Sequence, residues 1–150
     1  MADSPLKLRI SEAMKDAMRA RDMARLGTLR LALADIKQVE VDERIDPDDT
    51  RIIAIIDKMM KQRRESVRQY EAGERQDLAD QENFEISVLQ EFLPAALDSA
   101  ALEEIVQAAI AETSAETIKD MGKVMGLVKP KVIGRADMGM VSAQIKSLLS

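Results

Sequence analysis

The chain has 150 residues, of which 46% are apolar and 33% charged, and its formal net charge is −5. This composition is typical of a folded protein with one domain or two small ones, and it excludes a disordered chain. The sequence contains no cysteine and no histidine, which excludes disulfides, thiolate catalysis and cysteine-ligated zinc.

An all-α fold is expected, because two Phe, one Tyr and no Trp leave the core to aliphatic residues and ten Met. The first helix is predicted to begin at Ser4-Pro5, where a capping hydroxyl precedes a proline at the first helical position, and to run to about residue 20. Asp22 is expected to cap the second helix, which ends before Pro47 because proline breaks the apolar pattern.

The next two helices are predicted to form an antiparallel hairpin. The third runs from about residue 49 to 72, and Gly73 is expected to stop it in a left-handed conformation. The fourth runs from about residue 75 to 92 and is closed by Pro94.

Arg63 lies in the middle of the apolar stripe of the third helix, and Glu82 and Glu85 lie within the stripe of the fourth. Counted from the turn at Gly73, these three side chains are at similar heights when the helices pack antiparallel. We therefore predict a partly buried structural ion pair that fixes the register of the hairpin. A catalytic or ligand role for the same residues is the alternative.

Two charged segments next to or within the third helix allow competing interpretations. Acidic residues at positions 42–49 resemble a calcium loop, but Arg51 stands where such a loop needs glycine. Favourable charge at the start of a helix is the preferred explanation, and no metal is expected. The basic run with Lys61, Arg64 and Arg68 is expected to be a solvated face tied by ion pairs along the helix, with an RNA surface as the alternative.

Three shorter helices are predicted in the last third of the chain. Asp98 can cap the fifth helix, the sixth begins near residue 118, and Asp137 can cap the seventh. The organisation expected is an N-terminal helical domain over residues 1–95, containing the hairpin, followed by a small C-terminal three-helix bundle over residues 96–150.

The sixth helix carries an unusual outer face. Its apolar stripe is expected at Met121, Met125 and Val128, and Pro130 should end or kink the helix. The opposite face has two exposed glycines, and each costs the helix about 1 kcal/mol relative to alanine. This cost suggests that a partner approaches the helix backbone closely at this face, where the neighbouring lysines can bind phosphates. The alternative is that the glycines admit a neighbouring helix from the N-terminal part or from another subunit. The nucleic-acid-binding candidates are Lys119, Gly122, Lys123, Gly126, Lys129, Lys131 and Arg135.

The segments "TLRLALADIK", "KQRRESVRQYEAGERQDLADQENFEISVLQEFLP" and "IKDMGKVMGLVKPKVIGRADMGMVS" resemble the GatB/YqeY family, and the resemblance covers essentially the whole chain. It implies a helical N-terminal part and a C-terminal module similar to the tail domain of GatB, the tRNA-dependent amidotransferase subunit. In that enzyme the tail is associated with tRNA engagement, while the chemistry is done elsewhere. The expected function is a non-catalytic binding module, with tRNA, amidotransferase subunits or another protein as partner.

The family label also implies glutamine-dependent carbon–nitrogen ligase activity, so a part in that amidotransferase activity is one alternative function, and a protein-interaction adaptor is another. No amidase-type Gly/Ser-rich motif, Walker-type glycine loop or G-x-S-x-G elbow occurs in the sequence. We therefore expect neither intrinsic catalysis nor a cofactor.

The N-terminus lacks the apolar run of a signal peptide, and no stretch approaches the roughly 18 apolar residues that span a membrane. A cytoplasmic protein without membrane contact is expected.

Overall fold

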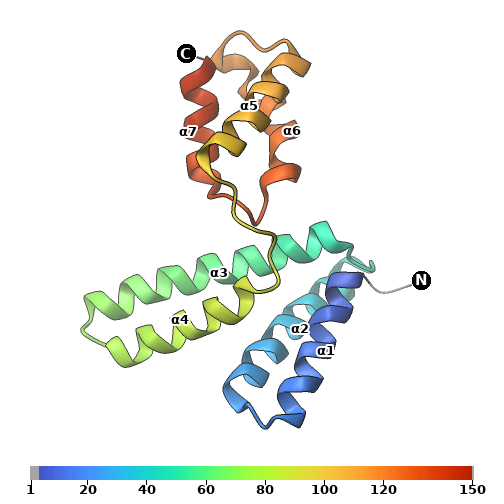
Figure 1. The fold of residues 1–150 in the computed structure, drawn as a ribbon, viewed down its shortest axis with the longest axis vertical. Helices are drawn as coiled ribbons and strands as arrows, with labels where there is room; N and C mark the ends of the chain where they lie inside the picture. The colour runs from blue at the N-terminus through green and yellow to red at the C-terminus, as the bar shows by residue number, and fades with distance from the viewer. Residues whose placement is uncertain (1–3, 150) are drawn as a thin grey trace. The chain divides into compact units, whose positions relative to one another are not determined.

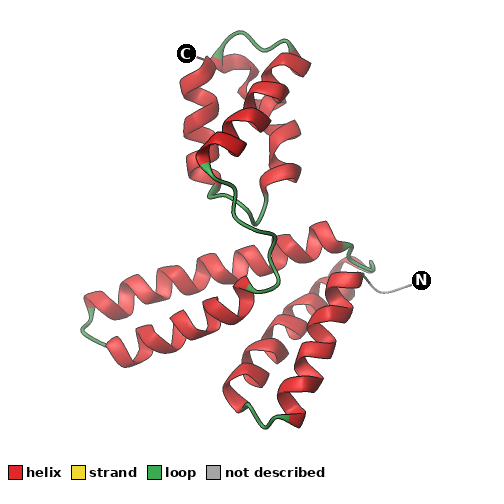
Figure 2. Ribbon diagram, in the orientation of Figure 1, coloured by secondary structure: helices red, strands yellow, loops and turns green. Residues whose placement is uncertain are grey.

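A computed structural model describes residues 4–149, which form helices joined by short loops and contain no strand (Figures 1 and 2). The expected all-α class is confirmed. The elements are α1 (Pro5–Arg19), α2 (Met23–Glu43), α3 (Asp49–Ala72), α4 (Gln76–Gln90), α5 (Ser99–Thr113), the short 3-10 helix η1 (Ile118–Asp120), α6 (Met121–Val132) and α7 (Met138–Leu149).

Four of the helices begin at a side chain that satisfies a free N–H group of the first turn. The Ser4 hydroxyl accepts from the Lys7 amide at 3.1 Å, and Asp98 accepts from the Ala101 amide at 2.7 Å. Asp22 and Asp48 cap α2 and α3 in the same way. Side-chain caps of this kind each stabilise a helix by about 1 kcal/mol, so the helix starts are set locally by the sequence.

The turn after α3 differs from the prediction in one residue. Gly73 has φ −88°, and the left-handed residue is Glu74, with φ 58°. The Gly73 amide still donates to the Gln69 carbonyl at 3.0 Å, while the Arg75 amide reaches back to the Tyr70 carbonyl at 2.8 Å. The helix therefore continues up to its glycine, and the reversal of the chain falls on the next residue.

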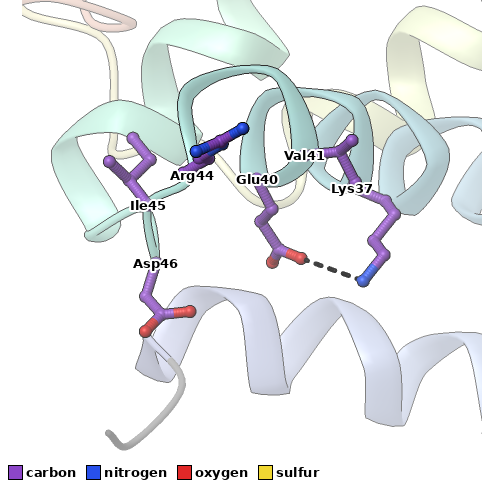
Figure 3. A pocket seen from close by; sticks show the side chains of 6 residues that line it. All are labelled: Lys37, Glu40, Val41, Arg44, Ile45 and Asp46. Carbon is purple, nitrogen blue, oxygen red and sulfur yellow. Dashed lines mark ion pairs between the residues drawn. The ribbon is translucent and has the colours of Figure 1, made fainter.

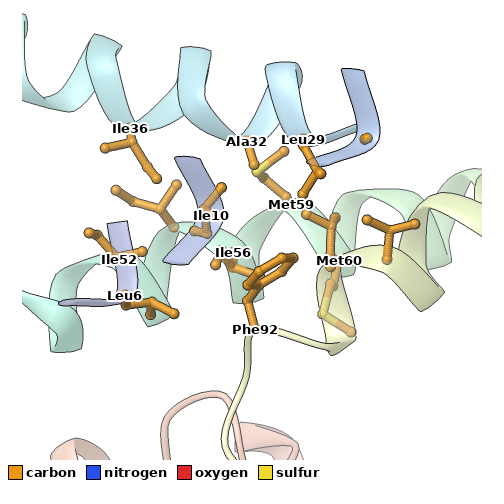
Figure 4. Packing of buried hydrophobic residues seen from close by; sticks show 14 of the residues in the cluster. Leu6, Ile10, Leu29, Ala32, Ile36, Ile52, Ile56, Met59, Met60 and Phe92 are labelled. Atoms are coloured by element: carbon orange, nitrogen blue, oxygen red, sulfur yellow. The ribbon is translucent and has the colours of Figure 1, made fainter. Parts of the chain in front are cut away.

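The chain divides into two compact units, with the boundary between Leu93 and Pro94. In the N-terminal unit, α1 packs along α2 and α3 packs along α4. Apolar side chains from all four helices meet in one core, which the Phe92 ring completes after α4 (Figure 4). Its largest fully buried members are Ile10, Leu29, Ile36, Ile52, Ile56, Met60 and Leu89.

The C-terminal unit has its own core, built by α5, α6 and α7. In α6 the buried stripe is Val124, Val128 and Val132, whereas the methionines expected to form it are only partly buried. Both methionines still pack against this core. Because η1 precedes α6, the α-helix begins at Met121 rather than near residue 118. In α7, Val141, Ile145 and Leu149 are buried, whereas Leu148 is 39% exposed.

Candidate nucleic-acid interface

The outer face of α6 lies opposite its valine stripe. At 100° per residue, Gly122, Lys123 and Gly126 turn away from Val124 and Val128, and all three are exposed. Lys129 flanks them, and Lys119 precedes them in η1; both are exposed. The structure thus brings three of the predicted lysines around two glycines.

The two glycines of this face are not needed for packing within the C-terminal unit. A Cβ atom built on Gly122 or Gly126 meets no other atom within 4 Å. Each exposed glycine inside a helix costs about 1 kcal/mol relative to alanine. A helix of the same unit therefore does not explain them, and the space above the backbone is open.

Pro130 does not end α6, which continues through it to Val132. Proline has no N–H group, so the carbonyl of Gly126, four residues earlier, receives no hydrogen bond from the helix at this point. The helix closes normally afterwards, because the Ile133 amide donates to the Lys129 carbonyl at 3.0 Å. The exposed face therefore combines an open backbone with a carbonyl that can accept a bond from a partner.

The continuation of the helix changes the expected grouping of cations. Lys129 and Lys131 are two helical residues apart, about 200° around the axis, so they lie on different sides of α6. Two of the nucleic-acid-binding candidates, Lys129 and Lys131, therefore do not share a face of the helix. Lys131 is exposed but does not belong to the face with the glycines.

Arg135 holds the chain segment that enters the C-terminal unit. Its Nε donates to the Ala95 carbonyl at 3.0 Å, and its own carbonyl accepts from the Leu97 amide at 2.9 Å. The residue is half-buried. Two bonds thus tie segment 95–97 to the loop between α6 and α7, and the guanidinium already has a partner. Just before Arg135, Gly134 has φ 74° and makes a left-handed turn.

Asp120 places one negative charge beside the lysines. Its carboxylate accepts from the backbone amides of Glu116 at 3.0 Å and Thr117 at 3.3 Å. These two bonds, with a smaller contribution from Lys123, hold the pKa of Asp120 below its usual value. Lys123 Nζ lies 3.9 Å from the carboxylate, but its side chain remains 71% exposed. The charge of Lys123 is therefore only loosely engaged.

In the N-terminal unit, the ion pair lies between α3 and α4. Arg63 Nε donates to Glu85 Oε2 at 3.0 Å, and its Nη1 donates to the Met59 carbonyl at 3.2 Å. The side chains of Arg63 and Glu85 are 14% and 16% exposed. Burial and repulsion from Glu85 raise the pKa of Glu82, and Arg63 partly offsets them. Arg63 therefore bonds the carboxylate of Glu85 and attracts that of Glu82, which partly offsets the rise in the pKa of Glu82.

The other charged segments are occupied by contacts within the chain. Asp49 accepts from the Ser4 hydroxyl and from the Leu6 amide. Lys61 pairs with Asp57 at 3.0 Å, one turn away on the same helix, as its position predicts. Within residues 4–149 no three acidic side chains form a group able to hold a metal ion.

The sequence did not predict an open depression where α2 ends (Figure 3). Its lining mixes both signs of charge with apolar side chains, and Lys37 Nζ lies 3.8 Å from Glu40 Oε2. Glu40 also receives Lys7 Nζ at 2.6 Å. Because its charges neutralise one another, the depression offers no preference for an anion or a cation.

Comparison with known proteins gives a family and distant relatives. The model of the Yqey-like protein family matches residues 7–149. Altered inheritance of mitochondria protein 41, mitochondrial, from Pyrenophora tritici-repentis is 28% identical over 145 residues, which cover 94% of this chain and 79% of that protein. Proteins of the same name from Eremothecium gossypii and Kluyveromyces lactis are 36% and 32% identical over 97 residues. These matches cover 64% of this chain and 52% of each protein, so the match spans about half the length of these two relatives.

None of the helices in the described part of the chain has the length and apolar run that crossing a bilayer requires.

Proposed function

The chain belongs to the YqeY-like family, and from this premise we propose that it is a non-catalytic binding module that engages tRNA or the machinery of tRNA-dependent amidation. The observation that carries the proposal is the outer face of α6. There, exposed lysines surround a helix backbone that two glycines leave open.

The chemistry of this face suits a phosphate backbone. Lysine is a compact cation that binds phosphate oxygens without strict geometry, and these contacts position a nucleic acid rather than read its sequence. The glycines allow a sugar–phosphate chain to approach the helix, and the carbonyl of Gly126 can accept a bond from a ribose hydroxyl. The face therefore favours RNA contact without base selectivity.

The distribution of charge in the C-terminal unit also favours RNA contact on the side of α6. Residues 98–117, which include α5, hold five acidic side chains and no basic one. Residues 118–149 hold six basic and two acidic side chains. Such an asymmetry steers a polyanion away from α5 and toward α6.

Two other functions compete with this proposal. A part in glutamine-dependent carbon–nitrogen ligase activity would require turnover of ATP or glutamine, and the sequence has no motif for either. An adaptor that binds another protein would use the glycines for helix packing instead of RNA contact. Capture of partners from lysate distinguishes the adaptor from the proposed RNA-binding module. The proposed module should retain tRNA that ribonuclease removes, whereas an adaptor should retain a protein.

Binding of unfractionated tRNA by the purified full chain tests the proposal. We expect weak, salt-sensitive binding that falls at least tenfold in the double variant Lys123→Glu/Lys129→Glu. The matched control is Lys146→Glu, which reverses the charge of an exposed residue on α7 and should change affinity little. Gly122→Val should also weaken binding, because its side chain enters the open space while valine still favours the helix over glycine. Equal affinity in all of these proteins would remove α6 from the RNA hypothesis.

The proposal includes two further expectations from the sequence. We propose that the N-terminal helical region and the C-terminal three-helix bundle fold independently, since their cores share no residue. A fragment of residues 94–150 should then unfold cooperatively on heating, with the marginal stability expected of its size.

We also propose a cytoplasmic location for this protein, although the relatives are named mitochondrial. Fractionation of the source cells tests it, and recovery within an organelle would contradict it.

A further inference from the structure

Helix α2 is apolar on two opposite faces, and only one of them packs inside the N-terminal unit. The outer face carries Met23, Leu31 and Val41, which are 66%, 47% and 60% exposed. Exposed apolar side chains gathered along one face of a helix can mark an interaction site. The buried residues of α2 are Leu26, Thr28, Leu29, Ala32 and Ile36.

Exposed residues of this outer face repeat at alternating spacings of three and four. This is the spacing of the seam along which two helices wind into a coiled coil. A Cβ atom built on Gly27 meets no other atom within 4 Å, so nothing in the N-terminal unit covers the seam at that point. The seam consists of Ala24, Gly27, Leu31, Ala34, Gln38 and Val41.

The two edges of the seam differ in the sign of their charges. Arg30 and Lys37 lie on one edge, and Asp35 and Asp42 lie on the other; all four are exposed. In a parallel pair of identical helices, each basic residue faces the residue five positions later on the other copy. Arg30 then meets Asp35 of the partner subunit, and Lys37 meets Asp42 of the partner subunit. In an antiparallel pair, edges of the same sign would meet and repel.

These edge charges are available for a partner. Within residues 4–149, the side chains of Arg30 and Asp35 make no hydrogen bond or ion pair. Lys37 is 72% exposed beside Glu40. Among the described residues, the carboxylate of Asp42 accepts only from Gln38 Nε2, at 2.8 Å. Gln38 is the polar member of the seam, and a single polar residue at such a position fixes the register of two helices.

We propose that the seam joins two copies of this chain in a parallel, two-fold symmetric dimer through α2. The charge pattern selects a second copy as occupant, because attraction on both edges arises when an identical helix lies parallel and in register. A two-fold axis makes the interface self-complementary, so it closes as a dimer and does not extend. The small residues Gly27 and Ala34 limit the buried area, so the dimer should form only at high protein concentration.

Sedimentation equilibrium of the full chain over a wide concentration range tests the proposal. We expect a monomer–dimer equilibrium that Leu31→Glu weakens at least tenfold, because it places a charge in the seam. The matched control is Leu8→Glu on α1, where the leucine is 51% exposed but lies outside the seam. Both variants should keep the helical circular dichroism of the parent. A parent that stays monomeric up to about 1 mM at low salt, or equal loss in both variants, overturns the proposal.

Orientation is tested by charge exchange and by cross-linking. Arg30→Asp/Lys37→Asp should be monomeric, and adding Asp35→Lys/Asp42→Lys to the same chain should restore the dimer. Because the chain has no cysteine, Val41→Cys provides a single thiol that faces its own copy only in a parallel seam. Oxidation should cross-link this variant but not Ser87→Cys, an exposed position on α4. A dimer that resists cross-linking at residue 41 contradicts the parallel arrangement.

Discussion

Arg63, on α3, is turned onto a carboxylate of α4 and is only 14% exposed, whereas the lysines of α6 are exposed. In the first case, both charges have partners within the chain. In the second, Lys123 has only a loose neighbour at 3.9 Å, and Lys129 has none within the described residues. Charged residues in the two segments therefore serve two purposes. Paired charges should affect the free energy of unfolding, and unpaired ones should affect binding.

The largest effect on stability is expected for Arg63→Ala. Removal of the guanidinium leaves Glu85 partly buried without its partner, and breaking such a pair costs about 2 kcal/mol, since some solvent reaches it. Urea unfolding measures the loss. The control Arg68→Ala removes an exposed pair and should cost under about 0.5 kcal/mol. Equal losses in the two variants would place Arg63 on the surface and remove the contrast.

A smaller loss is expected for Arg135→Leu. This variant loses the hydrogen bond to the Ala95 carbonyl but keeps the backbone bond to Leu97, so it should cost about 1 kcal/mol. Arg135 was predicted to contact RNA, yet its guanidinium is engaged. We therefore expect the salt dependence of tRNA binding to be unchanged, and a flatter dependence would return Arg135 to the interface.

An effect of opposite sign is expected for Gly126→Ala. The exposed helix gains about 1 kcal/mol, because alanine favours it and the new methyl group meets no atom. The same methyl group enters the space proposed for RNA, so tRNA affinity should fall while the midpoint of unfolding rises. If stability and tRNA affinity rise together, the glycines are not needed for RNA to approach the helix backbone.

The smallest effect is expected for Glu82→Gln. Because the pKa of Glu82 is raised in the folded protein, the unfolded chain loses this proton first as pH rises. The folded state of the parent therefore loses stability from about pH 4.5 upward, until the carboxyl group is ionised in both states. The variant lacks this loss and should be more stable at pH 7, by under about 1 kcal/mol. Unfolding at pH 4 and pH 7 measures the difference, and a variant less stable at pH 7 would contradict the cause assigned to the shift.

Local signals in the sequence predicted much of the fold. Caps at Ser4, Asp22 and Asp98 lie where helices begin, because capping needs only the next three residues. Counting from the turn predicted Arg63 at the height of Glu85, since two helices joined by a short turn have few possible registers.

Other features depend on contacts that local patterns do not contain. Arg135 bonds to Ala95, 40 residues away, and nothing near either residue predicts that the two segments meet. The buried stripe of α6 lies slightly to one side of the expected one, because packing against α5 and α7 decides which side chains of the helix are covered. The seam on the outer face of α2 was not predicted, because the apolar residues of the buried face were sufficient to predict the helix.

The most direct test of the outward role of α6 is the salt dependence of tRNA binding, measured for the parent, Lys123→Glu/Lys129→Glu and Arg63→Ala. If Lys119, Lys123 and Lys129 each neutralise one phosphate, log K should fall with log salt at a slope of about −2, from roughly −0.7 for each contact. Arg63→Ala should keep this slope despite its lower stability, and the double variant should flatten it to about −0.7, which is the contribution of Lys119 alone. A slope that is unchanged in the double variant, or lost in Arg63→Ala at temperatures where it is folded, would contradict the division between paired and unpaired charges.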